Sequence, residues 1–221
     1  MASVKVLLNK RQKNETIDRL MEASAPSVNF WLMMILSTFI VTLGLLIDNL
    51  SVIIGGMMVT PLLSPLLSFA MGVVVYDYKL IMRSIWLIIE SIILITFIAV
   101  VITLLSIERD MVSTLALEAK PSFEYLLISL FSGGTVAYAI AHPSLSDTLP
   151  GIAMSVALLS PLAALGIGLS FFQWEIIARS ANLFILNISG IILSAIFVFA
   201  FMDFKEAKSE ITKNIKEEKM K

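Results

Sequence analysis

The chain has 221 residues, of which 58% are hydrophobic and 15% charged, with a formal net charge of −1 at pH 7. A soluble domain of this length cannot bury so much apolar surface, so the composition excludes a soluble protein and predicts an integral membrane protein. The absence of cysteine excludes disulfides, thiolate metal ligands and a cysteine nucleophile.

Residues 1–26 carry five cations and no apolar core of signal-peptide length, so we interpret them as a cytoplasmic N-terminal segment. Each of the apolar runs that follow is near or above the roughly 20 residues that a helix needs to cross the hydrocarbon core. They are continuously apolar and do not alternate with period two, which favours helices over a barrel and predicts an all-α fold. The six runs are 27–47, 50–76, 80–106, 121–141, 149–172 and 176–202.

One segment occurs in two similar copies, which begin in the second and fifth runs and continue into the third and sixth. Residues 55–92 align without gaps on residues 151–188, and 14 of the 38 pairs are identical. The identities include Ser64-Pro65 with Ser160-Pro161, which chance agreement between apolar stretches rarely produces. A duplicated membrane unit is the usual plan of a transporter or channel.

The positive-inside rule favours both termini in the cytoplasm, because that topology places thirteen of the sixteen lysines and arginines inside. If the second and fifth runs were re-entrant, the same number of lysines and arginines would lie inside, so this count does not decide between the two topologies. The length of the two runs is the better guide, and it favours full crossings. Three crossings per copy is an odd number, which predicts an inverted 3+3 repeat. The expected domains are a first three-helix repeat over 27–106, a loop over 107–120, a second repeat over 121–202 and a charged cytoplasmic tail over 203–221.

Several motifs carry a resemblance to a known family. They are Leu43 to Asn49, Val52 to Met58 running into Pro61-Leu62-Leu63-Ser64-Pro65, and the later Leu158 to Leu162 and Leu186-Asn187. The chain resembles the uncharacterised hydrophobic membrane proteins grouped as domain of unknown function 389. The resemblance implies an ordered helix, an Asp-Asn turn and a proline-broken helix, and it implies no particular activity.

The serine–proline sites predict breaks in the second and fifth helices. A proline lacks the N–H of a regular helix, so Pro61, Pro65 and Pro161 should free the carbonyls four residues before them. The hydroxyls of Thr60, Ser64, Ser68 and Ser160 lie within a turn or two of these carbonyls. Two readings stay open: a structural kink whose serine bonds to its own helix, or a pair of breaks that coordinates a solute.

Glu90 stands near the centre of the third run, where an ionised carboxylate costs at least about 2.5 kcal/mol. It is either a proton- or cation-handling group or a structural hydrogen-bonding group, and Leu186 replaces it in the second copy. Asn187 and Asn182 lie in the sixth run, where an interhelical clamp and a solute contact are both open.

Asp48 and Asn49 occupy the turn before the second run, where capping of the following helix is the first expectation and a gate is the alternative. Arg83 and Arg179 stand near the starts of the third and sixth runs, where they would reach lipid headgroups or draw anions toward a pathway. We find no catalytic motif and no metal-ligand spacing around the single histidine, and therefore expect neither an enzyme nor a cofactor.

The functional hypothesis is a channel or secondary transporter for a small ion or polar solute, with its site between the broken helices. The alternative is a non-transporting membrane scaffold or sensor. Either would contact the lipid bilayer, assemble as a homo-oligomer and bind no nucleic acid. The candidate pathway residues are Thr60, Pro61, Ser64, Pro65, Glu90, Ser160, Pro161 and Asn187, with Asp48, Asn49, Arg83, Arg179 and Asn182 as secondary candidates.

Overall fold

The computed structural model describes residues 10–23, 25–106, 121–142, 145 and 150–204. Within these ranges every regular element is a helix, which confirms the all-helical prediction. The helices are α1 (Lys10–Ala23), α2 (Val28–Leu46), α3 (Leu50–Met57), α4 (Leu63–Val74), α5 (Tyr78–Leu105), α7 (Phe123–Ala141), α8 (Pro150–Ser170) and α9 (Trp174–Phe201).

The second apolar run forms two helices, α3 and α4, separated by residues 58–62, which we call the interruption. Pro61 lies within it, whereas Pro65 is the third residue of α4. The first residues of a helix have no carbonyl partner for their N–H groups, so a proline costs little at that position. The break therefore falls at Pro61 and not at Pro65.

The prediction of a broken fifth helix is wrong, because α8 continues through Pro161 without interruption. A proline inside a helix removes one backbone hydrogen bond, and packing against neighbouring helices can hold such a helix together.

Short polar side chains set the starts of α2 and α5. Ser27 accepts a hydrogen bond from the Phe30 backbone N–H at 3.1 Å and caps α2. Asp77 accepts one from Leu80 at 3.1 Å and caps α5. Each cap satisfies one of the backbone donors that a helix leaves unpaired at its N-terminus.

The sequence repeat corresponds to a repeat of helix boundaries. Helices α5 and α9 each have 28 residues, and α9 starts and ends 96 positions after α5 (78 and 174, 105 and 201). Helices α2 and α7 each have 19 residues. The two halves of the chain therefore contain matching sets of long helices.

The corner before each 28-residue helix is built in the same way. Gly72 accepts a hydrogen bond from the Asp77 N–H and Gly168 accepts one from Gln173, both at 2.9 Å. The residue before each donor has a left-handed backbone with φ of 54°. A Cβ on either glycine would lie 3.0 Å from an isoleucine side chain of the following helix, so that side chain would have to shift by a few tenths of an ångström.

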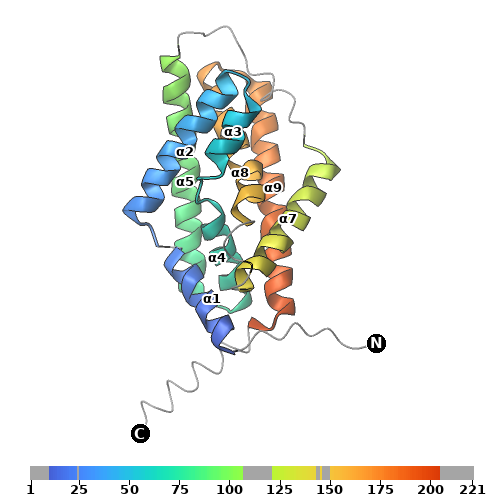
Figure 1. The fold of residues 1–221 in the computed structure, drawn as a ribbon. Coiled ribbons are helices and arrows are strands. Elements are labelled where there is room, and N and C mark those ends of the chain that lie inside the picture. Colours follow the sequence, from blue (N-terminus) through green and yellow to red (C-terminus); the bar gives the residue numbers. More distant parts are fainter. Residues whose placement is uncertain (1–9, 24, 107–120, 143–144, 146–149, 205–221) are drawn as a thin grey trace.

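Figure 1 shows that matching helices of the two halves run in opposite directions. Helix α5 rises from the lower to the upper end of the molecule, whereas α9 descends from the upper end. Helix α2 rises with α5, and α7 descends with α9.

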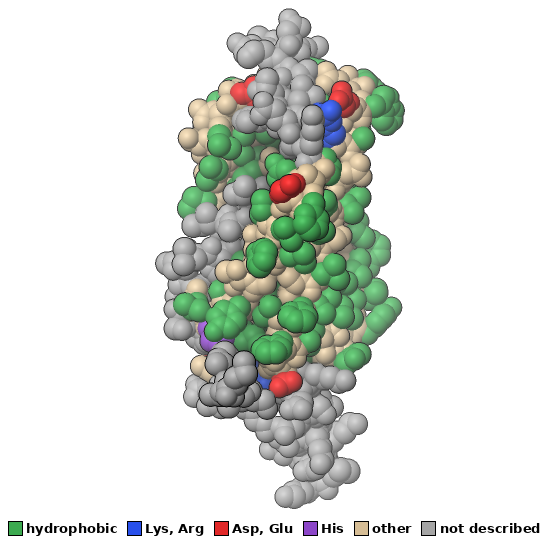
Figure 2. All heavy atoms as spheres, turned by 90° about the vertical axis from the view of Figure 1, so that its right-hand side faces the viewer, with side chains coloured by type: hydrophobic (Ala, Val, Ile, Leu, Met, Phe, Trp, Pro, Cys, Tyr) green, Lys and Arg blue, Asp and Glu red, His purple; other side chains and the backbone are tan. Residues whose placement is uncertain are grey.

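The outer surface is apolar over most of its height. Figure 2 shows hydrophobic side chains covering the middle of one face, with charged side chains mainly toward the two ends. Large hydrophobic residues such as Trp86, Phe97, Phe131 and Phe197 are exposed to the surroundings. Within the described residues, α2, α5, α7 and α9 are long and apolar enough to cross a membrane. These four helices indicate a membrane protein.

Candidate functional site

The interruption between α3 and α4 is a tight turn that largely satisfies its own backbone. Val59 donates its N–H to the Gly56 carbonyl at 3.3 Å, and Thr60 donates to Met57 at 3.2 Å. The expectation that Pro61 leaves the Met57 carbonyl free is therefore wrong. In this turn the Thr60 N–H takes the place of the N–H that Pro61 lacks, so the Met57 carbonyl keeps a donor.

The hydroxyls near the first serine–proline site also bond to backbone. Thr60 Oγ1 donates to the Gly56 carbonyl at 3.3 Å. Ser68 Oγ contacts the Ser64 carbonyl at 2.8 Å and the Leu20 carbonyl of α1 at 2.7 Å. Thr60 and Ser68 are buried, whereas Ser64 and Pro61 are half-buried. Two of the four candidate hydroxyls thus have a structural role.

The second serine–proline site lies inside α8. Ser160 is half-buried, and Pro161 is buried between the buried side chains of Leu159 and Leu162. Helix α8 packs mainly against α9 and α5, less against α3, and only slightly against α4. Contact between the helices that carry the two serine–proline pairs is therefore small, and their mutual approach stays a prediction.

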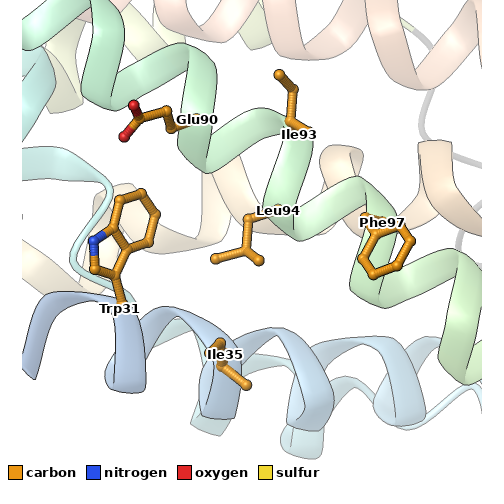
Figure 3. A pocket seen from close by; sticks show the side chains of 6 residues that line it. All are labelled: Trp31, Ile35, Glu90, Ile93, Leu94 and Phe97. Atoms are coloured by element: carbon orange, nitrogen blue, oxygen red, sulfur yellow. The ribbon is translucent and has the colours of Figure 1, made fainter. Parts of the chain in front are cut away.

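Glu90 lines a groove to which no residue of the interruption contributes. Glu90 is exposed about halfway along α5, and this groove of about 500 Å³ lies between α2 and α5. The other lining residues are Trp31, Ile35, Ile93, Leu94 and Phe97. Figure 3 shows Glu90 and Trp31 at one end of this α2–α5 groove, with Leu94 between the two helices and Phe97 farther along α5.

In the second half, the corresponding helices α7 and α9 pack closely together through small residues. A Cβ on Gly133 of α7 would lie within 3 Å of the Ile191 backbone, and one on Gly190 of α9 would lie within 3 Å of Ser129. Small residues four apart let two helix backbones approach closely. Leu94 of the groove occupies the position of Gly190, 96 residues earlier, and α2 and α5 share a smaller contact than α7 and α9. The groove is thus a feature of the first half.

Asn187 and Asn182 lie on different faces of α9. Asn187 is buried with 3% of its surface exposed, whereas Asn182 is exposed. The residue at the position of Asn187 in the first half, Ser91, is also buried and donates to the Leu87 carbonyl at 2.7 Å. Both halves therefore place a polar side chain at this buried position.

The secondary candidates lie in a turn and near the starts of helices, and for one of them the sequence predicted the structural role. Asn49 accepts a hydrogen bond from the Val52 N–H at 3.2 Å and caps α3, which confirms the capping prediction. Asp48, before it, adopts a left-handed φ of 50°. Arg179 pairs with Glu175 one turn away on α9, and Arg83 is exposed on α5.

Sequence reasoning found Glu90 but not the aromatic residues beside it. Trp31 stands near the start of α2 and lines the same groove as Glu90, although the two residues are far apart in the chain. The available signal is the asymmetry of the repeat, since Leu186 replaces the carboxylate in the second half. Among the described residues no group of three or more histidine, aspartate or glutamate side chains is placed to hold a metal ion.

Comparison with known proteins identifies a family but no activity. The family described as Domain of unknown function (DUF389) matches residues 57–193. An uncharacterised protein of Methanocaldococcus jannaschii is 29% identical over 173 residues, which cover 76% of this chain and 52% of that protein. The chain thus spans about half the length of this curated relative. No solved structure matches the chain.

Proposed function

Because the chain belongs to the family described as Domain of unknown function (DUF389), whose description assigns no activity, we propose a function from the arrangement of its helices. The protein is a membrane channel or secondary transporter for a small ion or polar solute. It has six crossings in an inverted 3+3 repeat, with α3 and α4 together forming the second crossing and α8 forming the fifth.

The matched boundaries and opposite directions of the two halves support this architecture. Helices α5 and α9 have equal lengths and run in opposite directions, as do α2 and α7 (Figure 1). Two units that are upside down relative to each other are the common plan of secondary transporters, in which one unit rocks against the other.

The observation that carries the proposal is the interruption at residues 58–62, which occurs in one half only. Its residues include the buried Thr60, and the preceding helix α3 packs against α2 and α8. Non-helical backbone at membrane depth is tolerated where protein or a water-filled cavity surrounds it. The helix ends there carry partial charges that can contact an ion or a dipolar solute.

One observation favours the second candidate function, a non-transporting scaffold or sensor. Pro65 and Pro161 are buried beside apolar residues, and the hydroxyls of Thr60 and Ser68 bond to backbone carbonyls. Kinks that are packed in this way need no solute. The two candidates therefore differ in whether the interruption opens to a solute.

Flux through reconstituted protein separates the two candidates. We suggest liposomes containing the full chain and dyes for H⁺, Na⁺, K⁺ and Cl⁻, with a swelling assay for small polar solutes. Pro61→Ala would favour a continuous helix through the interruption, and Thr60→Val would remove its hydroxyl. The matched control is Thr135→Val, because Thr135 makes the same kind of bond to the Phe131 carbonyl, at 2.8 Å, on the exposed face of α7.

The transport proposal expects flux above that of empty liposomes, a several-fold change in Pro61→Ala and Thr60→Val, and wild-type flux in Thr135→Val. Absence of flux for the whole panel would favour the scaffold. Equal flux in all three variants would move the pathway away from the interruption.

Both termini are proposed to face the cytoplasm, because thirteen of the sixteen lysines and arginines then lie inside. A six-helix unit is small for a transporter, so we also propose that the protein acts as a homo-oligomer. We propose separately that it is not an enzyme, because the sequence contains no catalytic motif that we recognise.

A further inference from the structure

The α2–α5 groove has an apolar lining, and Glu90 stands at one end of it (Figure 3). Its residues other than Glu90 are two aromatic and three aliphatic side chains. Its volume of about 500 Å³ falls within the range of small-molecule sites. It opens on the outer face of two candidate membrane spans, so a ligand dissolved in the bilayer can reach it directly.

Glu90 is the one charged residue among those that line this groove. Among the described residues no hydrogen bond or ion pair to its carboxylate is found. Arg83 lies on the same helix but about 10 Å away along the axis. An ionised carboxylate in apolar surroundings is costly unless a positive charge accompanies it. A ligand that brings such a charge would lower this cost.

The aromatic ring beside Glu90 supports the same selection. Figure 3 shows the Trp31 ring extending from α2 toward the end of the groove where the Glu90 carboxylate lies. The face of an indole attracts organic cations, and it does so more strongly where water is excluded. Ile35, Leu94 and Phe97 continue the groove with surface suited to an apolar body.

The lining argues against other occupants. A metal ion needs several oxygen ligands, whereas the groove offers one carboxylate. An anion would be repelled by Glu90. A lipid acyl chain fits the aliphatic surface but leaves the carboxylate without a partner.

We propose that the α2–α5 groove binds a lipophilic organic cation, with Glu90 pairing with its charge, Trp31 contacting that charge through its ring, and Ile35, Leu94 and Phe97 holding its apolar body. Among the described residues, the second half does not repeat this combination of residues. In the second half Leu186 replaces Glu90, and small residues bring α7 and α9 together where the groove lies in the first half. The proposal stands whether or not the protein transports a solute.

Binding is tested on the full chain in lipid nanodiscs with radiolabelled tetraphenylphosphonium, corrected for empty nanodiscs. We expect saturable binding of one cation per chain. Glu90→Gln should weaken it at least about tenfold, and Leu94→Trp should block it by filling the groove. Glu175→Gln is the matched control, because Glu175 is an exposed carboxylate near the start of α9, outside the groove, and it should bind as the wild type does.

Two further measurements keep the outcome clear. Triphenylphosphine oxide, a neutral molecule of similar shape, should compete poorly with the cation. In a chain carrying Trp86→Phe and Trp174→Phe, the remaining Trp31 should change its fluorescence on titration with tetraphenylphosphonium. Circular dichroism and gel filtration confirm that each variant is folded.

Absence of saturable binding would overturn the proposal. Equal affinity of folded Glu90→Gln, or equal competition by the neutral molecule, would also overturn it and would point to a lipid chain as the occupant. Transport assays do not enter this test, so its failure is distinct from failure of the transport proposal.

Discussion

The hydroxyl of Ser68 in α4 lies 2.7 Å from the Leu20 carbonyl of α1, and both residues are buried. Leu20 belongs to the last turn of α1, whose carbonyls have no N–H donor further along the helix. The Ser68 hydroxyl, which also lies 2.8 Å from the Ser64 carbonyl, therefore offers the Leu20 carbonyl a donor that the helix itself lacks. This bond attaches the N-terminal helix to the half of the molecule that contains the interruption.

Replacing this hydroxyl should loosen α1. We expect Ser68→Ala to destabilise the docking of α1 on α4 by about 1–2 kcal/mol, because the buried Leu20 carbonyl loses its donor. Hydrogen exchange of the α1 amides in detergent should then become roughly tenfold faster. The control is Ser51→Ala, because Ser51 is exposed on α3. Unchanged exchange in Ser68→Ala would show that α1 is held by its apolar contacts alone.

Adjacent glycines of α7 should respond oppositely to the same substitution. A Cβ on Gly133 would lie 2.7 Å from the Ile191 Cα, which cannot move without shifting α9, whereas one on Gly134 meets only ordinary contacts at 3.7 Å or more. We expect Gly133→Ala to destabilise the fold by about 1–3 kcal/mol and Gly134→Ala to stabilise it by up to about 1 kcal/mol through helix propensity. Thermal unfolding in detergent compares the two. Equal melting temperatures would contradict the close approach of α7 and α9.

The N-terminal caps of α5 and α9, which occupy matching positions in the repeat, should respond differently to alanine substitution. Asp77 caps α5 through its side chain, whereas Gln173 occupies the same position before α9 without a side-chain cap. Asp77→Ala should therefore cost about 0.5–2 kcal/mol of stability, and Gln173→Ala close to zero. Denaturant or thermal unfolding of both variants measures the difference. A larger loss in Gln173→Ala would mean that capping is not what distinguishes the two corners.

The inverted arrangement predicts which corners share a side of the membrane. The chain has no cysteine, so single cysteines can be introduced without removing native ones. Tyr76 and Phe172 stand at matching, exposed corners of the two halves, and Figure 1 places the α4–α5 corner at the lower end and the α8–α9 corner at the upper end. A membrane-impermeant maleimide applied to intact cells should label Phe172→Cys and should reach Tyr76→Cys only after the membrane is opened. Labelling of both from one side would contradict the inverted repeat.

Much of the fold could be predicted from sequence because membrane helices are long, continuous apolar segments. The run predicted over 121–141 became α7 at Phe123–Ala141, and the run over 176–202 became α9 at Trp174–Phe201. The cap at Asn49 was also predictable, since it acts on a backbone donor three residues away. These features depend on residues that are neighbours along the chain.

The prolines were harder to interpret, because a proline limits one backbone bond but does not determine what surrounds it. Pro61, Pro65 and Pro161 were all predicted to break helices. The helix ends only around Pro61, while Pro65 occupies a position that needs no donor and Pro161 lies inside a continuous α8. Packing against neighbouring helices decides between these outcomes, and the sequence around each proline does not show which helices will be its neighbours.

The sequence by itself therefore determined the class of protein, the helical runs, the internal repeat and the presence of an isolated carboxylate in an apolar run. Only the tertiary structure decided that Glu90 lines a groove beside Trp31, that Ser68 bonds to Leu20, and that α7 and α9 close where α2 and α5 stay apart. The physical reason is that hydropathy and capping act over a few residues. Which side chains meet between helices depends on how distant segments pack, and small differences between the two copies of the repeat change that packing.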